Sequence, residues 1–136
     1  MFDFSKDEIG IGVDIEKINR FESTKITNTV SFLNRVFTQK ELDYCFSGQT
    51  SAQRLAGRFA CKEAIFKAVS IFGEKKLAYR EIHIINGRNG IPNANIQRED
   101  YRDVNIIFSL SNTKELVIAF AIATRPKVKT KTKVTS

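Results

Sequence analysis

The sequence has few cysteines, a single histidine and no long apolar run, and each shortage excludes a class of protein. Cys45 and Cys61 are the only cysteines, too few for a disulfide framework and not spaced as a pair of metal ligands. No segment approaches the ~20 consecutive apolar residues that span a bilayer. The first ten residues lack the basic and apolar regions of a secretory signal. His83 lies in an expected strand, which favours a structural role. We therefore expect a reduced, cytoplasmic protein that does not contact a membrane.

The length and the charge limit the organisation and the kind of partner. A chain of 136 residues accommodates one domain, which we place at residues 1–126, followed by a basic tail at 127–136. The formal net charge of +7 favours an anionic partner. Nucleic acid, a phosphorylated small molecule and an acidic protein all meet that description, so the charge alone does not choose between them.

Residues 9–15 show the strict alternation of a half-buried β-strand. One side carries Ile9, Ile11, Val13 and Ile15, and the other carries Gly10, Gly12 and Asp14. The two glycines leave Asp14 on a surface without neighbouring side chains, as a closely approaching ligand requires. Residues 16–24 then have the pattern of a short helix or helical turn.

The strongest helical pattern runs from Ala52 to Phe72 and stops at Gly73. Its apolar stripe consists of Leu55, Phe59, Phe66 and Val69. An adjacent row presents Ala56, Ala60, Glu63 and Lys67. A shorter amphipathic segment is expected at 31–35, and Thr38 with Glu41 forms a capping box that opens a helix through Tyr44.

The last third of the sequence is rich in β-strand signals. Residues 82–85 predict a strand, followed by the turn-rich segment 86–90. Residues 104–111 alternate, and residues 116–123 are apolar throughout, as in a strand covered on both faces. A short polar connection between the last two predicts a hairpin. The expected fold is therefore α+β, a single domain in which a small antiparallel sheet packs on a long helix.

Three groups of residues could carry chemistry: Gly12-Val-Asp14 with Arg20, the helical segment 58–68, and the segment 108–119. Taken singly, each has an ordinary explanation: a strand-end aspartate, a surface ion pair between Glu63 and Lys67, and a polar turn. Together, two carboxylates with nearby basic residues suit Mg²⁺ holding a phosphate ester. Lys62 falls within the apolar stripe of its helix, so it must either extend to solvent or meet an anion.

The order GxD(x5)R, RFAxKEAxxKA and a serine-rich strand end followed by TKE resembles the holo-acyl-carrier-protein synthase family of 4′-phosphopantetheinyl transferases. The resemblance extends from about Ile9 to Ala123. Supporting matches are Arg35-Val-Phe-Thr38 with Glu41, and the turn Asn89-Gly90-Ile-Pro92. It implies an α+β fold and a homotrimer with active sites at the subunit boundaries.

The resemblance also implies a reaction. A serine hydroxyl of an acidic acyl-carrier protein attacks the β-phosphorus of coenzyme A and releases adenosine 3′,5′-bisphosphate. The resemblance implies that Asp14 and Glu63 bind Mg²⁺ and that Lys67 contacts the reacting phosphate. Arg58 and Lys62 would contact other phosphates of coenzyme A, and Gly90 and Pro92 would lie near the nucleotide. Arg20 would contact the carrier protein. Either Glu63 or a water held by the metal accepts the serine proton.

The chain departs from the family pattern at two positions. Asn112 stands where many relatives have histidine; it can hydrogen-bond coenzyme A but cannot take a charge. Ile91 replaces the lysine of the family's NGKP turn. Two other readings stay open on the sequence: a relative that binds coenzyme A or a carrier protein without turnover, and a basic nucleic-acid-binding protein. The second lacks a recognised motif, and we expect no nucleic-acid partner.

Overall fold

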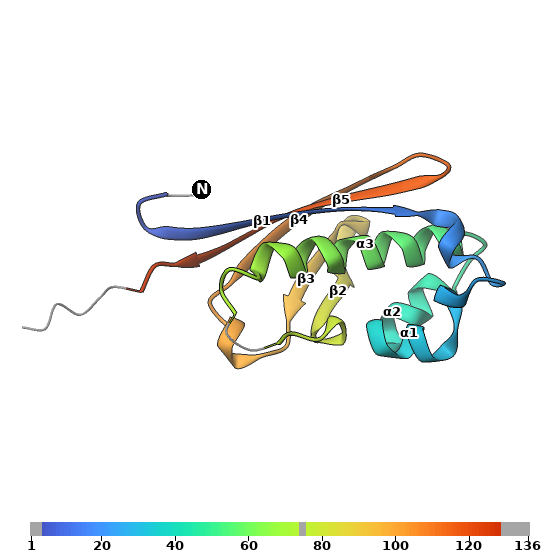
Figure 1. Ribbon diagram of the computed structural model, residues 1–136, viewed down its shortest axis with the longest axis horizontal. Helices are drawn as coiled ribbons and strands as arrows, with labels where there is room; N and C mark the ends of the chain where they lie inside the picture. The colour runs from blue at the N-terminus through green and yellow to red at the C-terminus, as the bar shows by residue number, and fades with distance from the viewer. Residues whose placement is uncertain (1–3, 74–75, 129–136) are drawn as a thin grey trace, which may run out of the picture.

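The computed structural model describes residues 4–73 and 76–128. It shows an α+β fold in which a three-stranded sheet lies along one long helix (Figure 1). The elements are β1 (Asp7–Lys17), α1 (Val30–Val36), α2 (Gln39–Cys45), α3 (Ser51–Val69), β2 (Ile82–Asn86), β3 (Pro92–Ile96), β4 (Asn105–Asn112) and β5 (Leu116–Pro126). The predicted class is confirmed, and residues 129–136 of the expected tail lie outside the described residues.

The two sheets are both antiparallel. The larger has the order β1-β5-β4, and the smaller pairs β2 with β3. The predicted hairpin of residues 104–123 is confirmed as β4 and β5, with Asn112 opposite Val117 at its end. Strand β3 was not predicted. Residues 16–17, predicted as helical, belong to β1, and only Ile18–Phe21 form a 3₁₀ turn.

Strand β1 packs against α3 through its two glycines. A Cβ atom at Gly12 would lie 1.8 Å from the carbonyl oxygen of Ala64, and one at Gly10 would lie 1.7 Å from that of Ala68. Both neighbours are backbone atoms that a side chain cannot displace. The bare surface predicted around Asp14 is thus filled by the helix rather than kept clear for a ligand, and the glycines set the distance between β1 and α3.

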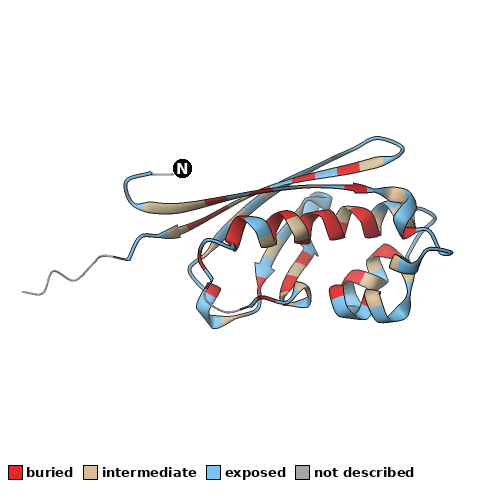
Figure 2. Cartoon of the chain, viewed as in Figure 1, coloured by how far each residue is buried: buried red, intermediate tan, exposed pale blue. Residues whose placement is uncertain are grey.

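The opposite face of the larger sheet is apolar and exposed. Ile11 is 63% exposed, Val13 50% and Phe120 42%, and in the register of the sheet Val13 stands opposite Phe120. The expectation that residues 116–123 are covered on both faces is therefore wrong for the single chain. In Figure 2 buried residues run along α3, and on β5 buried positions are interspersed with exposed ones.

The short helices follow local signals in the sequence. The Thr38 side chain accepts the Glu41 amide hydrogen, while Glu41 accepts the Thr38 amide hydrogen at 2.7 Å, which confirms the capping box.

Cys45 and Cys61 are buried and free. Within the described ranges, no helix is long and apolar enough to cross a membrane.

Candidate active site

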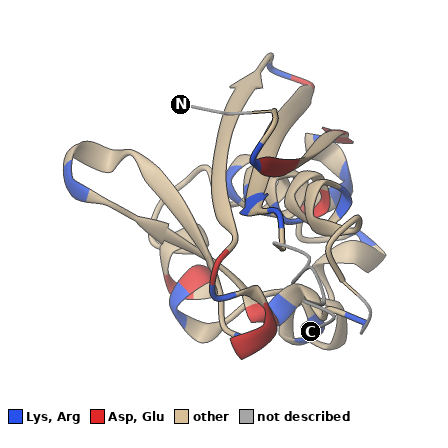
Figure 3. Ribbon diagram, turned by 90° about the vertical axis from the view of Figure 1, so that its left-hand side faces the viewer, with Lys and Arg blue, Asp and Glu red and all other residues tan. Residues whose placement is uncertain are grey.

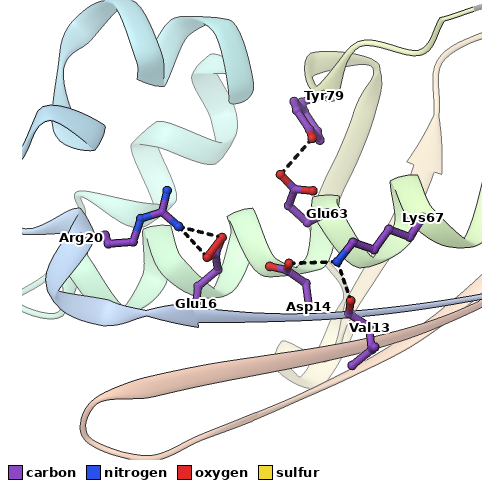
Figure 4. A network of polar contacts seen from close by, with 7 residues as sticks. All are labelled: Val13, Asp14, Glu16, Arg20, Glu63, Lys67 and Tyr79. Carbon is purple, nitrogen blue, oxygen red and sulfur yellow. Dashed lines mark hydrogen bonds and ion pairs between the residues drawn. The ribbon is translucent and has the colours of Figure 1, made fainter.

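The structure brings Asp14 on β1 and Glu63 on α3 side by side, although 49 positions separate them in the sequence (Figure 4). Lys67, one turn beyond Glu63, reaches across to β1. Its ammonium donates to the carbonyl oxygen of Val13 at 2.9 Å and lies 3.4 Å from Asp14 Oδ1. The close packing at Gly12 places all three functional groups on one short stretch of the interface between strand and helix.

The carboxylate of Asp14 is only partly satisfied by Lys67. Burial raises its pKa above the ordinary value, and the carboxylate of Glu63 acts in the same direction, while Lys67 opposes both. Its Oδ2 atom is buried and receives no hydrogen bond from any described residue. A cation at Oδ2 would supply the missing partner.

The donor set fits Mg²⁺. This ion binds one or two carboxylates and keeps waters and substrate phosphate oxygens as its other ligands. Among residues 4–73 and 76–128, no group of three or more His, Cys, Asp or Glu is arranged to hold a metal by itself. Asp14 and Glu63 would therefore share the ion with substrate. Lys67, whose side chain is half-exposed, would exchange its contacts with Val13 and Asp14 for a substrate phosphate.

A third carboxylate, that of Glu16, lies beside Asp14 and Glu63 and was not predicted from the sequence as a site residue. It is buried, and burial followed by the charge of Asp14 raises its pKa. Arg20 holds it with two hydrogen bonds from Nη1, at 2.7 and 3.1 Å. The alternation of β1 could have revealed it, because residues 14 and 16 share a face.

Tyr79 was also missed. Its hydroxyl donates to Glu63 Oε1 at 2.9 Å. Burial, and then the hydrogen bond to Glu63, raises the pKa of Tyr79 to about 12, so the phenol is a hydrogen-bond donor at neutral pH. Tyr79 lies in the 3₁₀ turn Tyr79–Glu81, and no sequence pattern connects this turn with Glu63.

Four of the predicted coenzyme A-binding residues line one hollow of about 260 Å³. They are Arg58, Gly90, Pro92 and Asn112. Arg58 stacks over the ring of Tyr44 at 4.5 Å and donates to the Asn86 side chain. Arg54, which was not predicted as a site residue, stacks over the same ring at 4.6 Å. Two guanidinium groups beside an aromatic ring suit an anionic ligand that carries a flat base.

Lys62 does not join this hollow, and its predicted contact with a coenzyme A phosphate is wrong for this structure. Its side chain is fully buried and pairs with Glu41 at 2.7 Å. It also donates to the carbonyl oxygens of Val36 and Tyr79, both at 2.9 Å. The anion expected beside Lys62 is therefore Glu41 of the same chain, and this buried ion pair connects α3 to α2.

The fold, the paired carboxylates and the basic hollow agree with the comparison to protein families. Residues 10–121 match the family model described as the 4′-phosphopantetheinyl transferase superfamily. The chain therefore belongs to the 4′-phosphopantetheinyl transferase superfamily.

Within this superfamily, the curated relatives that align over most of the chain include holo-[acyl-carrier-protein] synthases. That of Caldicellulosiruptor saccharolyticus is 38% identical over 122 residues, covering 83% of this chain and 94% of the relative. That of Protochlamydia amoebophila is 34% identical over 117 residues, covering 84% of this chain and 96% of the relative.

Solved structures agree with these relatives. The crystal structure of the Bacillus anthracis holo-(acyl-carrier-protein) synthase in complex with CoA (3′,5′-ADP) aligns with a TM-score of 0.70 and 29% identity, over 85% of this chain and 96% of that chain. The Helicobacter pylori holo-[acyl-carrier-protein] synthase in complex with coenzyme A aligns with a TM-score of 0.69 and 28% identity, over 83% and 98%.

Proposed function

We propose that this protein transfers the 4′-phosphopantetheine arm of coenzyme A to a serine of an acyl-carrier protein, with Mg²⁺ as cofactor. The observation that carries the proposal is the meeting of Asp14, Glu63 and Lys67 at the contact between β1 and α3. Family membership supplies the reaction class, and the two relatives solved with coenzyme A or its nucleotide portion supply the donor substrate. The two free, buried cysteines suit the reducing cytoplasm expected from the sequence.

In the reaction, the carrier serine oxygen forms a bond to the β-phosphorus while the bond from that phosphorus to the oxygen of adenosine 3′,5′-bisphosphate breaks. Bound Mg²⁺ would neutralise charge on the pyrophosphate. Asp14 and Glu63 would hold the ion, and Lys67 would leave Asp14 to contact the phosphate. The serine proton passes to Glu63 or to solvent in the site.

The hollow lined by Arg58, Gly90, Pro92 and Asn112 is the proposed place of the nucleotide. Arg20 remains the proposed contact for the acidic carrier protein, since its side chain is 43% exposed while it holds Glu16. Basic and acidic residues are interspersed over the described elements in Figure 3.

The exposed apolar face of β1 and β5 supports the proposed homotrimer, because a patch of this kind marks an interaction surface. We expect light scattering to give three times the mass of one chain. Phe120→Glu should reduce the assembly to monomers and remove activity, because it buries a charge in the interface. Ile26→Glu, at a position 84% exposed in the 3₁₀ turn Ile26–Asn28, is the matched control. A wild-type protein that stays monomeric at working concentration would contradict the trimer.

The transfer itself is tested by mass spectrometry of an apo carrier protein after incubation with the enzyme, coenzyme A and Mg²⁺. We expect the carrier to gain the mass of one phosphopantetheine group, and removal of Mg²⁺ by EDTA should prevent the gain. Binding of coenzyme A with no gain in mass, under conditions in which a related synthase modifies the same carrier, would support the alternative of a catalytically weakened relative.

Asn112 tests the nucleotide site. It lies at the end of β4, lines the hollow, and donates to the neighbouring Thr113 carbonyl at 3.2 Å. If it hydrogen-bonds coenzyme A, Asn112→Ala should weaken binding by about 0.5–1.5 kcal/mol, the usual net value of a neutral hydrogen bond. Isothermal titration with coenzyme A measures this, and Asn112→His should bind and turn over at least as well as the wild type. Unchanged affinity in Asn112→Ala would leave the residue as a turn former only.

A further inference from the structure

Tyr79 is held against α3 by contacts that do not involve its hydroxyl. Its ring centroid lies 5.4 Å from that of Phe66 and 6.1 Å from that of Phe59, and its backbone carbonyl accepts a hydrogen bond from Lys62 at 2.9 Å. Lys62 is itself fixed by the buried pair with Glu41. The phenol is therefore fixed in position before any ligand binds.

The hydroxyl of this fixed ring meets one oxygen of Glu63. The distance from Tyr79 Oη to Glu63 Oε1 is 2.9 Å, and Figure 4 shows the carboxyl group of Glu63 between Tyr79 and Asp14. Glu63 has three rotatable side-chain bonds, and ordering them costs conformational entropy. The usual helical partner one turn away, Lys67, is taken by β1 through Val13 and Asp14. Among the described residues, Tyr79 is thus the hydrogen-bond donor that orders this side chain.

We propose that Tyr79 is a positioning residue for the metal site: its hydroxyl holds Glu63 Oε1, so that the carboxylate is presented beside Asp14 in the orientation that a divalent cation needs. This inference rests on the proposed Mg²⁺ site and adds a residue to it. Groups that hydrogen-bond a metal ligand commonly change metal affinity by about ten- to a hundredfold when they are removed. The half-buried position of Tyr79 lets water replace part of the lost bond, which favours the lower end of that range.

The test is Tyr79→Phe, which keeps the ring contacts and removes only the hydroxyl. Binding of Mn²⁺ to the whole protein, followed by the electron paramagnetic resonance signal of the free ion, should weaken by about tenfold. In steady-state assays the Mg²⁺ concentration for half-maximal rate should rise by the same factor, and kcat at saturating Mg²⁺ should return to near the wild-type value. The control is Tyr101→Phe, at a buried tyrosine whose ring faces Arg98 at 5.4 Å; it should change neither quantity.

Two results would overturn the role of Tyr79 while leaving the proposed function in place. One is unchanged Mn²⁺ affinity together with unchanged kcat in Tyr79→Phe, which would make the ring a packing residue only. The other is a lower kcat at saturating Mg²⁺ with unchanged Mn²⁺ affinity, which would place the hydroxyl in the chemistry instead. Failure of the wild-type protein to bind Mn²⁺, with or without coenzyme A, would overturn the metal site together with the role of Tyr79.

Discussion

Replacing Asp14 by asparagine should lower the rate of transfer by at least about a thousandfold and leave the protein folded. The substitution keeps the shape of the side chain but removes the charge that would hold Mg²⁺. Several kcal/mol of transition-state stabilisation are lost with a catalytic metal, and each 1.36 kcal/mol is a factor of ten in rate. Steady-state assays with coenzyme A and an apo carrier protein measure the loss, and Glu63→Gln should give a loss of similar size.

The same Asp14→Asn substitution should leave the thermal stability of the metal-free protein unchanged or raise it. Burial raises the pKa of Asp14 in the folded state above 3.8, so folding disfavours its ionised form. The contribution of this group to stability therefore falls as the pH rises from 3.8 through the folded-state pKa, and stays low at neutral pH. Without metal at pH 7, Asp14→Asn should melt at the same temperature as the wild type or higher.

Magnesium should raise the melting temperature of the wild type and not that of the variant. Asp43→Asn, at an exposed position on α2, provides the same chemical change away from the site and should behave as the wild type throughout. An Asp14→Asn protein that keeps more than a tenth of the wild-type rate would exclude Asp14 as a metal ligand.

Gly12→Ala should unfold the protein much more easily and remove its activity. The added Cβ would lie 1.8 Å from the carbonyl oxygen of Ala64 and 2.8 Å from the amide nitrogen of Ala68. Since both are backbone atoms of α3, the strand and the helix must separate. Overpacking of this kind costs typically about 1–3 kcal/mol and sometimes more, and contacts with rigid backbone place this variant at the upper end. The separation would also move Asp14 away from Glu63.

Urea denaturation measures the loss of stability in Gly12→Ala, and the transfer assay measures its loss of activity. Gly57→Ala is the matched control for stability, because its Cβ would meet only Leu110 Cδ1 at 4.0 Å. It does not serve as a control for transfer, because Gly57 lines the proposed nucleotide hollow. That change should stabilise the protein by about 0.5–1 kcal/mol, the usual advantage of alanine over glycine inside a helix. A Gly12→Ala protein with wild-type stability would show that close packing at β1 does not set the position of Asp14.

The elements predicted with success are those whose signal is local. The long helix, expected at 52–72, is α3 at Ser51–Val69, because a stripe of apolar residues at helical spacing is readable within one segment. The hairpin of β4 and β5 follows from an alternating segment and an apolar segment joined by a short polar turn. Strand β3 was missed because its sequence, Pro92-Asn-Ala-Asn-Ile96, is poor in residues that favour strands.

What could not be predicted depends on residues that are distant in sequence. The alternation of β1 showed its two faces correctly but not which one meets α3. The glycine face is buried, because the helix backbone itself fills the space of the missing side chains. Lys62 was assigned to substrate because its partner, Glu41, stands on another helix, and the capping box already explained that glutamate. A buried charge such as that of Lys62 can be explained only when the residue that pairs with it is known.

The pairing of β1 with β5 has a consequence for biosynthesis. Among the described strands, β1 pairs only with β5, which follows it in the chain after β2, β3 and β4, with Asp7 opposite Pro126. Contacts between such distant segments are slow to form, and domains fold as units during synthesis. The nascent chain must therefore keep β1, and Asp14 with it, without a strand partner until residues 116–126 have emerged. Premature termination before β5 would leave an apolar strand with open edges, which is a substrate for aggregation and degradation rather than a shorter enzyme.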